Sequence, residues 1–201
     1  MLEFDRVTRR FEDREVVRSF SLSVEPGERV ALRGPNGSGK TTLLRCALGT
    51  LTPSDGRVTV GGHLAGSLES RQLTGVSLSQ ERSFYMRLTG LENLLFFARL
   101  RRGTERDVDS IVDELGLGEI AAQRADRCSS GQLQQLSIAR ALVGHPRVAL
   151  LDEPTRSLDS DARARLWTAL DRRPETAVLI ATHLEEDVER CSRVVELEST
   201  A

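Results

Sequence analysis

The chain has 201 residues, and at about 150 residues per domain this length predicts one compact domain. Hydrophobic residues make up 39% of the chain and charged residues 29%, which is close to the globular average and argues against a disordered or fibrous protein. The 28 basic and 30 acidic residues leave a formal net charge of −2. Such a balance supplies no overall field for nucleic acid, so no nucleic acid partner is expected.

The cysteines and the apolar runs bear on where the protein works. Cys46, Cys128 and Cys191 are odd in number and widely spaced, which suits reduced thiols better than a disulfide framework. Residues 1–11 contain no apolar signal core, and the longest apolar runs, such as 94–98, are far too short to span a bilayer. We therefore expect a cytoplasmic protein that is neither exported nor inserted in a membrane.

Short β-like runs recur along the chain, separated by turn signals such as 25–28 and 53–56. Several of these runs are continuously apolar, as strands buried in a parallel sheet are. Together they indicate an α/β protein whose first part mixes hairpins with one strand that leads into a helix. The expected strands are 2–7, 19–24, 29–33, 57–60, 76–79, 148–151, 177–181 and 193–197.

The middle of the chain changes to a helical pattern. Thr89 and Thr104 each have an acidic residue three positions later, which is the spacing of a capping box. Apolar residues at helical intervals follow both signals, and Gly116 ends the second run. Residues from about 83 to 144 are therefore expected to form a helical insert between strands.

Residues 34–41 read Gly-Pro-Asn-Gly-Ser-Gly-Lys-Thr, which is the P-loop pattern G-x-x-x-x-G-K-[ST] between an apolar strand and a helical run. Its glycines let backbone N–H groups converge on a phosphate at a helix N-terminus. Of the 28 basic residues 27 are arginines, and the one lysine, Lys40, stands where a slim point charge can reach the β- and γ-phosphates. Thr41 is expected to hold Mg²⁺. The predicted phosphate cradle consists of Gly34, Pro35, Asn36, Gly37, Ser38, Gly39, Lys40, Thr41 and Thr42.

A pair of carboxylates follows the apolar strand 148–151. Asp152 stands at the strand tip and is expected to join the Mg²⁺ shell, while Glu153 faces the γ-phosphate. Adjacent carboxylates with different tasks suit hydrolysis, in which Glu153 orients and deprotonates the attacking water. A turn that merely ends a buried strand is the alternative interpretation of the same residues.

With these motifs in this order, the chain resembles the nucleotide-binding subunit of an ABC transporter over nearly its whole length. The resemblance implies ATP and Mg²⁺ as ligands and an Mg-dependent hydrolysis of ATP to ADP and phosphate. It also implies a P-loop NTPase core, with a mixed, mostly parallel sheet and an antiparallel β subdomain, plus an inserted helical lobe. Within a single domain of residues 1–201, it assigns 1–82 and 145–201 to the core and 83–144 to the lobe.

Three further residues gain a role from the resemblance. Phe11 matches the aromatic residue that stacks on adenine, with Phe4 and Phe20 as rivals for that role. Gln80 matches the glutamine at the junction of core and lobe, whose amide bonds the metal or the attacking water. His183, which follows an apolar strand, matches the histidine that donates to the γ-phosphate.

Residues 128–132, Cys-Ser-Ser-Gly-Gln, match the signature loop of the family, which usually reads Leu-Ser-Gly-Gly-Gln. Three positions depart from the common pattern: Cys128, Ser130 and, where arginine is common, Gln135. The residues expected to meet phosphate at the start of the following helix are Ser129, Gly131 and Gln132. In the family this loop completes the site of a second cassette. A head-to-tail dimer that closes on two ATP is therefore implied, as a homodimer or a heterodimer.

The resemblance also implies separate transmembrane permease subunits, which would place the chain at the inner face of the cell membrane. Residues 79–90 and 152–159 are similar to ABC-2 type cassettes, and the short chain suits haem-exporter cassettes, so export is favoured. Phe84, Tyr85 and Met86 are candidates for an apolar groove that accepts a permease helix. Core packing of the lobe is the alternative role for these three side chains.

Two other function classes remain open at this level. A soluble ABC ATPase with no role in transport is one, although such proteins usually carry two cassettes or a long coiled coil. A weakly active regulatory cassette paired with a competent partner is the other, and the presence of Lys40, Gln80, Glu153 and His183 argues against it. A P-loop kinase would need neither the signature loop nor His183.

Overall fold

A computed structural model of the chain describes residues 1–12, 14–78 and 84–198, and its strands form one parallel and one antiparallel sheet. The parallel sheet has the order β6-β7-β8-β3-β9, formed by β3 Arg29–Arg33, β6 Thr74–Ser77, β7 Val148–Asp152, β8 Ala177–Ala181 and β9 Arg193–Glu196. The antiparallel sheet has the order β2-β1-β4-β5, formed by β1 Leu2–Phe11, β2 Arg14–Val24, β4 Asp55–Val60 and β5 His63–Leu64. Parallel and antiparallel strands are thus segregated.

The parallel sheet is covered on both faces, which explains why its central strands read as continuous apolar runs. Every residue of β7 and β8 is buried. Along β7, Val148 and Leu150 pack into one apolar core and Ala149 and Leu151 into another, because neighbouring side chains of a strand point to opposite faces. The first core also contains α1 and the antiparallel sheet, whereas the second contains α3, α4, α6 and α7.

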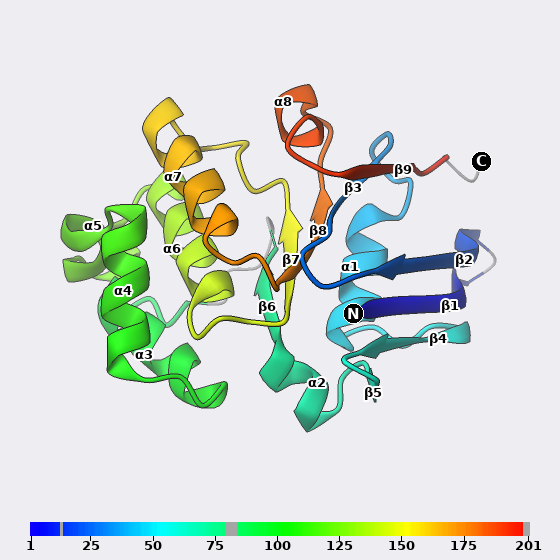
Figure 1. Ribbon diagram of the computed structural model, residues 1–201, viewed down its shortest axis with the longest axis horizontal. Coiled ribbons are helices and arrows are strands. Elements are labelled where there is room, and N and C mark those ends of the chain that lie inside the picture. Colours follow the sequence, from blue (N-terminus) through cyan, green and yellow to red (C-terminus); the bar gives the residue numbers. More distant parts are fainter. Residues whose placement is uncertain (13, 79–83, 199–201) are drawn as a thin grey trace.

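The helices include four that lie between β6 and β7, where the helical insert is predicted, and these gather away from β1, β2 and β4 in Figure 1. Capping boxes at Thr89, Thr104 and Ser129 start three of them, and Gly116 in the left-handed conformation ends one. Among the described residues no helix has the length and apolar character needed to cross a bilayer. The bounds are α1 Lys40–Leu48, α2 Leu68–Leu73, α3 Gly90–Leu100, α4 Glu105–Leu115, α5 Gly118–Ala122, α6 Ser130–Leu142, α7 Ser160–Asp171 and α8 Glu185–Val188, with a 3₁₀ turn at Ala125–Arg127.

Several predicted strands differ in their bounds from the observed ones. β1 continues from the predicted end at residue 7 to Phe11, β4 begins at Asp55 rather than at residue 57, and two further strands differ at their beginnings. The predicted strand 19–24 is only the second half of β2, whose first half mixes two valines with charged residues and is added by pairing with β1 as far as Phe11. The predicted strand 76–79 begins earlier, because β6 pairs with β7 from Thr74 onward. Both differences come from partners distant in the sequence, which local apolar patterns do not reveal.

Candidate nucleotide-binding site

Most of the residues singled out in the sequence converge in one open cleft of about 600 Å³. The cleft lies between the antiparallel sheet, the N-terminus of α1 and the carboxyl end of β7. Such a position, outside the carboxyl ends of parallel strands, is the usual ligand site of an open α/β sheet. The lining residues are Phe11, Arg14, Val16, Asn36, Gly37, Gly39, Lys40, Thr41, Thr42, Asp152, Glu153 and Arg156.

The loop between β3 and α1 presents backbone rather than side chains to this cleft. Gly39, at the N-cap of α1, has a φ of +95°, which a side chain would strain. A Cβ there would also lie 2.9 Å from Val17 Cγ2 and 3.0 Å from Val16 O. Since a glycine cap has no side-chain oxygen, the first N–H groups of α1 are left to an outside acceptor, and the helix dipole favours an anion.

Lys40 points its ammonium into the centre of the same loop. Its Nζ donates to the carbonyl oxygens of Gly34, at 2.6 Å, and Pro35, at 3.0 Å. The residue is 8% exposed, so the charge is held by the loop rather than by solvent. The ammonium is therefore already positioned where the loop would place an anion.

Thr41 and Asp152 bring two oxygen ligands together beside Lys40. The Thr41 hydroxyl donates to Asp152 Oδ2 at 3.1 Å, although the two residues are 111 positions apart. Asp152 is 3% exposed, because it ends the buried strand β7 and pairs with Ala181 of β8. Thr41 and Asp152, the two predicted ligands of the metal, thus lie together at the carboxyl edge of the parallel sheet.

Glu153 and His183 meet at the end of the same sheet. His183 Nδ1 lies 2.7 Å from Glu153 Oε1, and the other carboxylate oxygen, Oε2, is buried without a hydrogen-bond partner among the described residues. The Glu153 side chain is 11% exposed and that of His183 is 50% exposed. Glu153 also has a φ of +48°, a conformation that is rare for a residue with a side chain and is typical of functional sites.

Phe11 is the predicted aromatic residue that lines the cleft, and its two rivals pack elsewhere. Phe4 is 2% exposed, and its ring meets that of Phe20 edge to face at 5.5 Å. Phe11 is 42% exposed, and the Arg9 guanidinium lies over its ring at 4.5 Å. Of the three phenylalanines, Phe11 therefore has the geometry that stacking on a base requires.

The signature residues lie in a second cleft, apart from the P-loop. Ser129 is the N-cap of α6, where its hydroxyl accepts from Gln132 N at 3.2 Å and its own N–H donates to Gln132 Oε1 at 2.8 Å. Burial and the nearby Asp126 raise the pKa of the Cys128 thiol. This cleft of about 620 Å³ is lined by Gly116, Glu119, Ile120, Ser129, Gly131, Gln132, Gln135, Ser157, Asp159 and Arg165.

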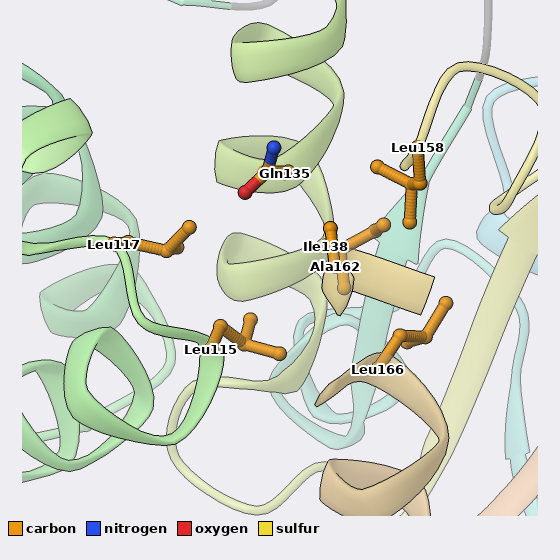
Figure 2. Close-up of a pocket in the computed structure, with 7 residues that line it drawn as sticks. All are labelled: Leu115, Leu117, Gln135, Ile138, Leu158, Ala162 and Leu166. Atoms are coloured by element: carbon orange, nitrogen blue, oxygen red, sulfur yellow. The ribbon is translucent and has the colours of Figure 1, made fainter. Parts of the chain in front are cut away.

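Gln135, one of the departures from the family signature, also borders a small apolar cavity under the second cleft. Figure 2 shows Gln135 together with the other lining residues, which come from α6, α7, the end of α4 and the loops next to them. The cavity holds only about 10 Å³, the size of a single water, and Gln135 is its one polar lining residue. It is therefore a packing seam between α6 and α7 rather than a ligand site. The apolar lining consists of Leu115, Leu117, Ile138, Leu158, Ala162 and Leu166.

Some residues of the two clefts were not predicted, and one predicted residue is not described. Arg14 and Val16 line the first cleft from the first half of β2, which carries no motif. Arg156 lines it from the loop after Glu153, and nothing in the sequence predicted that this residue lines the cleft. Gln80 lies outside the described residues, so its predicted contact with the metal or water stays a prediction.

Solved structures similar to this chain show the same fold. An "ATP binding subunit of ABC transporter" aligns with a TM-score of 0.91 and 24% identity over 100% of this chain and 88% of its own. The cassette MJ0796, in a dimeric post-hydrolysis state bound to ADP and Pi, aligns with a TM-score of 0.85 and 25% identity over 100% of this chain and 97% of its own. The predicted P-loop fold class is therefore confirmed.

Sequence comparisons give the family. The family model described as ABC transporter matches residues 17–156. The ABC transporter ATP-binding protein NatA of Bacillus subtilis is 34% identical over 99% of this chain and 86% of its own length. The Nod factor export ATP-binding protein I of Neorhizobium galegae is 36% identical over 98% of this chain, which spans 59% of that protein's length. It likewise spans 65% of the uncharacterized ABC transporter ATP-binding protein YdbJ of B. subtilis. The chain belongs to the ATP-binding proteins of the ABC transporter family.

Proposed function

We propose that the chain binds ATP in the first cleft and hydrolyses it to ADP and phosphate, as the ATP-binding subunit of a transporter. The observation that carries the proposal is the contact of His183 with Glu153, which lines the cleft that also contains Lys40 and Phe11. A site that only binds ATP would need the P-loop and the Phe11 ring but no proton acceptor. The buried, unpaired oxygen of Glu153 adds a proton acceptor, which only a reaction needs.

The residues beside Lys40 fit Mg²⁺. A hydroxyl and a carboxylate oxygen, from Thr41 and Asp152, already lie 3.1 Å apart, and hard oxygen ligands of this kind suit that ion. Mg²⁺ usually takes one or two carboxylates and completes its shell with water and phosphate. When bound, it would neutralise charge on the phosphates, with Thr41 and Asp152 as its protein ligands.

Four side chains have distinct parts in the proposed reaction. Phe11 stacks on the base, and Lys40 and the N–H groups of α1 bind the phosphates. Glu153 orients a water for in-line attack and takes its proton, while His183 donates to the γ-phosphate and fixes the Glu153 carboxylate. The contact between these two residues therefore defines the geometry of the attack.

The first experiment separates binding from hydrolysis. Lys40→Ala is expected to weaken ATP binding, whereas Glu153→Gln is expected to bind ATP and lose turnover, because an amide cannot take the proton. ATP binding and phosphate release are measured for both, with the exposed Glu175→Gln as matched control. Unchanged hydrolysis in Glu153→Gln would contradict the role of Glu153 as the base.

The second cleft supports a shared site between two chains. Ser129 and the first N–H groups of α6 face a cleft that contains neither the P-loop nor Glu153. These donors can meet a triphosphate when a second cassette presents its own P-loop to them, so we expect ATP to drive dimer formation. Lys40→Ala and Ser129→Arg chains should each be inactive alone and regain partial activity when mixed. If ATP-dependent mixed dimers form without any activity, a shared site is ruled out, unless both sites of the dimer must fire together.

A third surface is proposed for the permease. An apolar groove of about 420 Å³ lies between α2, β6 and the end of α3. Leu68 and Leu100 on its rim are 65% and 58% exposed. Burial, and then the charge of Arg140, lower the pKa of the Arg101 guanidinium to about 10. The groove therefore fits an amphipathic permease helix that carries an acidic side chain.

The predicted groove residues 84–86 divide between two roles. Phe84 packs against the core of the helices, with the Arg140 guanidinium 4.7 Å from its ring, as the packing alternative had it. Tyr85 and Met86 are 51% and 41% exposed. Both remain available for the permease, and neither lines the groove itself.

The groove proposal is tested with two exposed leucines. Leu100→Glu in the groove is expected to abolish capture of the chain by its permease in membrane fractions while ATP binding persists. Leu64, which is 62% exposed on β5 and outside the groove, supplies the matched control Leu64→Glu. Equal loss of capture in both variants would contradict docking in the groove.

The direction of transport that we propose is export. It is supported by the similarity to a Nod factor export protein, and accumulation of cargo in inverted vesicles on addition of ATP would establish it.

A further inference from the structure

Asp187, on α8, is a fully buried carboxylate outside the nucleotide cleft. It is 0% exposed, and both of its oxygens accept from the hydroxyl of Thr155, at 2.7 and 2.9 Å. Its Oδ2 also accepts from the hydroxyl of Thr182 at 2.9 Å. Both threonines are themselves 0% exposed. A carboxylate is retained in the interior only where hydrogen bonds compensate for lost hydration, and here two hydroxyls supply them.

The two threonines stand beside the residues of the reaction. Thr182 immediately precedes His183, and Thr155 follows Glu153 by two positions. The ladder between β7 and β8 ends at Asp152 and Ala181, so beyond that point strand pairing no longer joins the two loops to each other. One backbone bond continues it, from Glu153 N to Ala181 O at 2.8 Å. Asp187 therefore supplies the side-chain connection between the two loops beneath the site.

We propose that Asp187 is a positioning residue for hydrolysis, which acts by holding the His183 loop and the Glu153 loop at a fixed separation. The proposal rests on the roles proposed above for Glu153 and His183. The two side chains meet at 2.7 Å on the cleft side, and Asp187 joins the same two loops on the buried side. Thr182 extends this network, because its hydroxyl also accepts from Leu184 N at 3.1 Å. The carboxylate thus fixes both loops at once.

The expected consequence is a loss of turnover rather than of binding. Phe11, the P-loop and the start of α1, which would bind ATP, receive none of the hydrogen bonds that Asp187 makes to Thr155 and Thr182. A shift of about 1 Å in a reacting group is enough to lower a rate about 100-fold. We therefore expect Asp187→Ala, Thr155→Val and Thr182→Val to lower kcat about 10- to 100-fold, and the KM for ATP to change by less than about threefold.

Matched variants separate positioning from stability. Thr176 donates to Pro146 O at 2.8 Å, is 5% exposed and lies before β8, at the end opposite the site. Thr176→Val also removes one buried hydrogen bond, so its Tm should fall by a similar amount, about 2–4 °C, while kcat stays unchanged. Thr155→Ser and Thr182→Ser keep the hydroxyls, and we expect both to restore most of the turnover.

A second readout follows His183 without any turnover. The chain has three histidines, so the imidazole ¹⁵N signals of His183 can be assigned with His63→Gln and His145→Gln. Asp187→Asn should shift the His183 signals in the chain without nucleotide, and Thr176→Val should not. Proportional loss of kcat and Tm in all variants, or unmoved His183 signals, would overturn the proposal. If Glu153→Gln still hydrolyses ATP, the proposed reaction is refuted. If Glu153→Gln is inactive but the Asp187 variants keep the wild-type turnover, only the positioning role of Asp187 is refuted.

Discussion

The Phe11 ring, on which adenine is proposed to stack, gives the most specific prediction on the affinity for ATP. The Arg9 guanidinium lies over one face of the Phe11 ring at 4.5 Å, and Arg9 Nη1 donates to Thr52 O at 2.9 Å. The ring is therefore held from one side and offers its other face to the cleft. Stacking of a base on an aromatic ring contributes about 1–3 kcal/mol, so Phe11→Ala should raise the Kd for ATP about 5- to 150-fold. Phe11→Trp should keep the affinity.

Arg9 should contribute indirectly, through the ring. A cation over an exposed aromatic ring contributes about 0.5–1 kcal/mol, so Arg9→Ala should raise the Kd for ATP about two- to fivefold by releasing Phe11. In the Phe11→Ala background the same substitution should have no further effect, because no ring is left to hold. The double-mutant cycle therefore measures the coupling of these two residues.

Calorimetric titration tests both residues with two ligands. ATP carries a base, and tripolyphosphate carries the phosphates alone, so only the affinity for ATP should depend on Phe11 and Arg9. The single variants, the double variant and Phe11→Trp are titrated with each ligand. If Phe11→Ala weakens tripolyphosphate as much as ATP, or if Phe11→Trp loses as much affinity as Phe11→Ala, the ring has a packing role and the stacking argument is refuted.

Three further predictions concern stability. Glu114 pairs with Arg173 at 2.8 Å, and their side chains are 15% and 4% exposed, so Glu114→Ala should lower the free energy of unfolding in urea by about 3–5 kcal/mol. Burial raises the pKa of Cys46 and of Cys191 to about 11 from an unfolded value of 9.0, so the folded chain holds these protons longer and stability should fall as pH rises from 9 to 11. Urea titrations of the two Cys→Ala variants should show a weaker fall. A Cβ on Gly75 would lie 1.7 Å from a backbone oxygen of α6, so Gly75→Ala should cost more than about 4 kcal/mol and show a much lower Tm.

The sequence was informative wherever the chemistry lies in one contiguous stretch. The P-loop strand, loop and helix follow one another from residue 29 to residue 48, so the position of Lys40 could be predicted from spacing alone. The same holds for the capping boxes at Thr89 and Thr104, whose partners stand three residues away. Local geometry and local sequence coincide in these segments.

The rest could not be predicted, because the partners meet only through the sheet. Asp187 and Thr155 are 32 positions apart, and no spacing rule links a carboxylate on a four-residue helix to a hydroxyl after another strand. Such contacts follow from strand order, which the apolar runs alone leave undetermined.

The arrangement of the sheet also bears on why one chain would not form a complete ATP site by itself. In the order β6-β7-β8-β3-β9, the loop that carries Lys40 follows β3, whereas α6, which begins at Ser129, packs against β6 at the other edge. α1 packs into the apolar core on one face of this sheet and α6 into the core on the other, so the sheet itself lies between the two helices. The donors at the start of α6 line a cleft that shares no lining residue with the cleft of Lys40. A second chain that turns its P-loop toward Ser129 meets no such barrier, and this asymmetry supports two shared sites in a head-to-tail dimer.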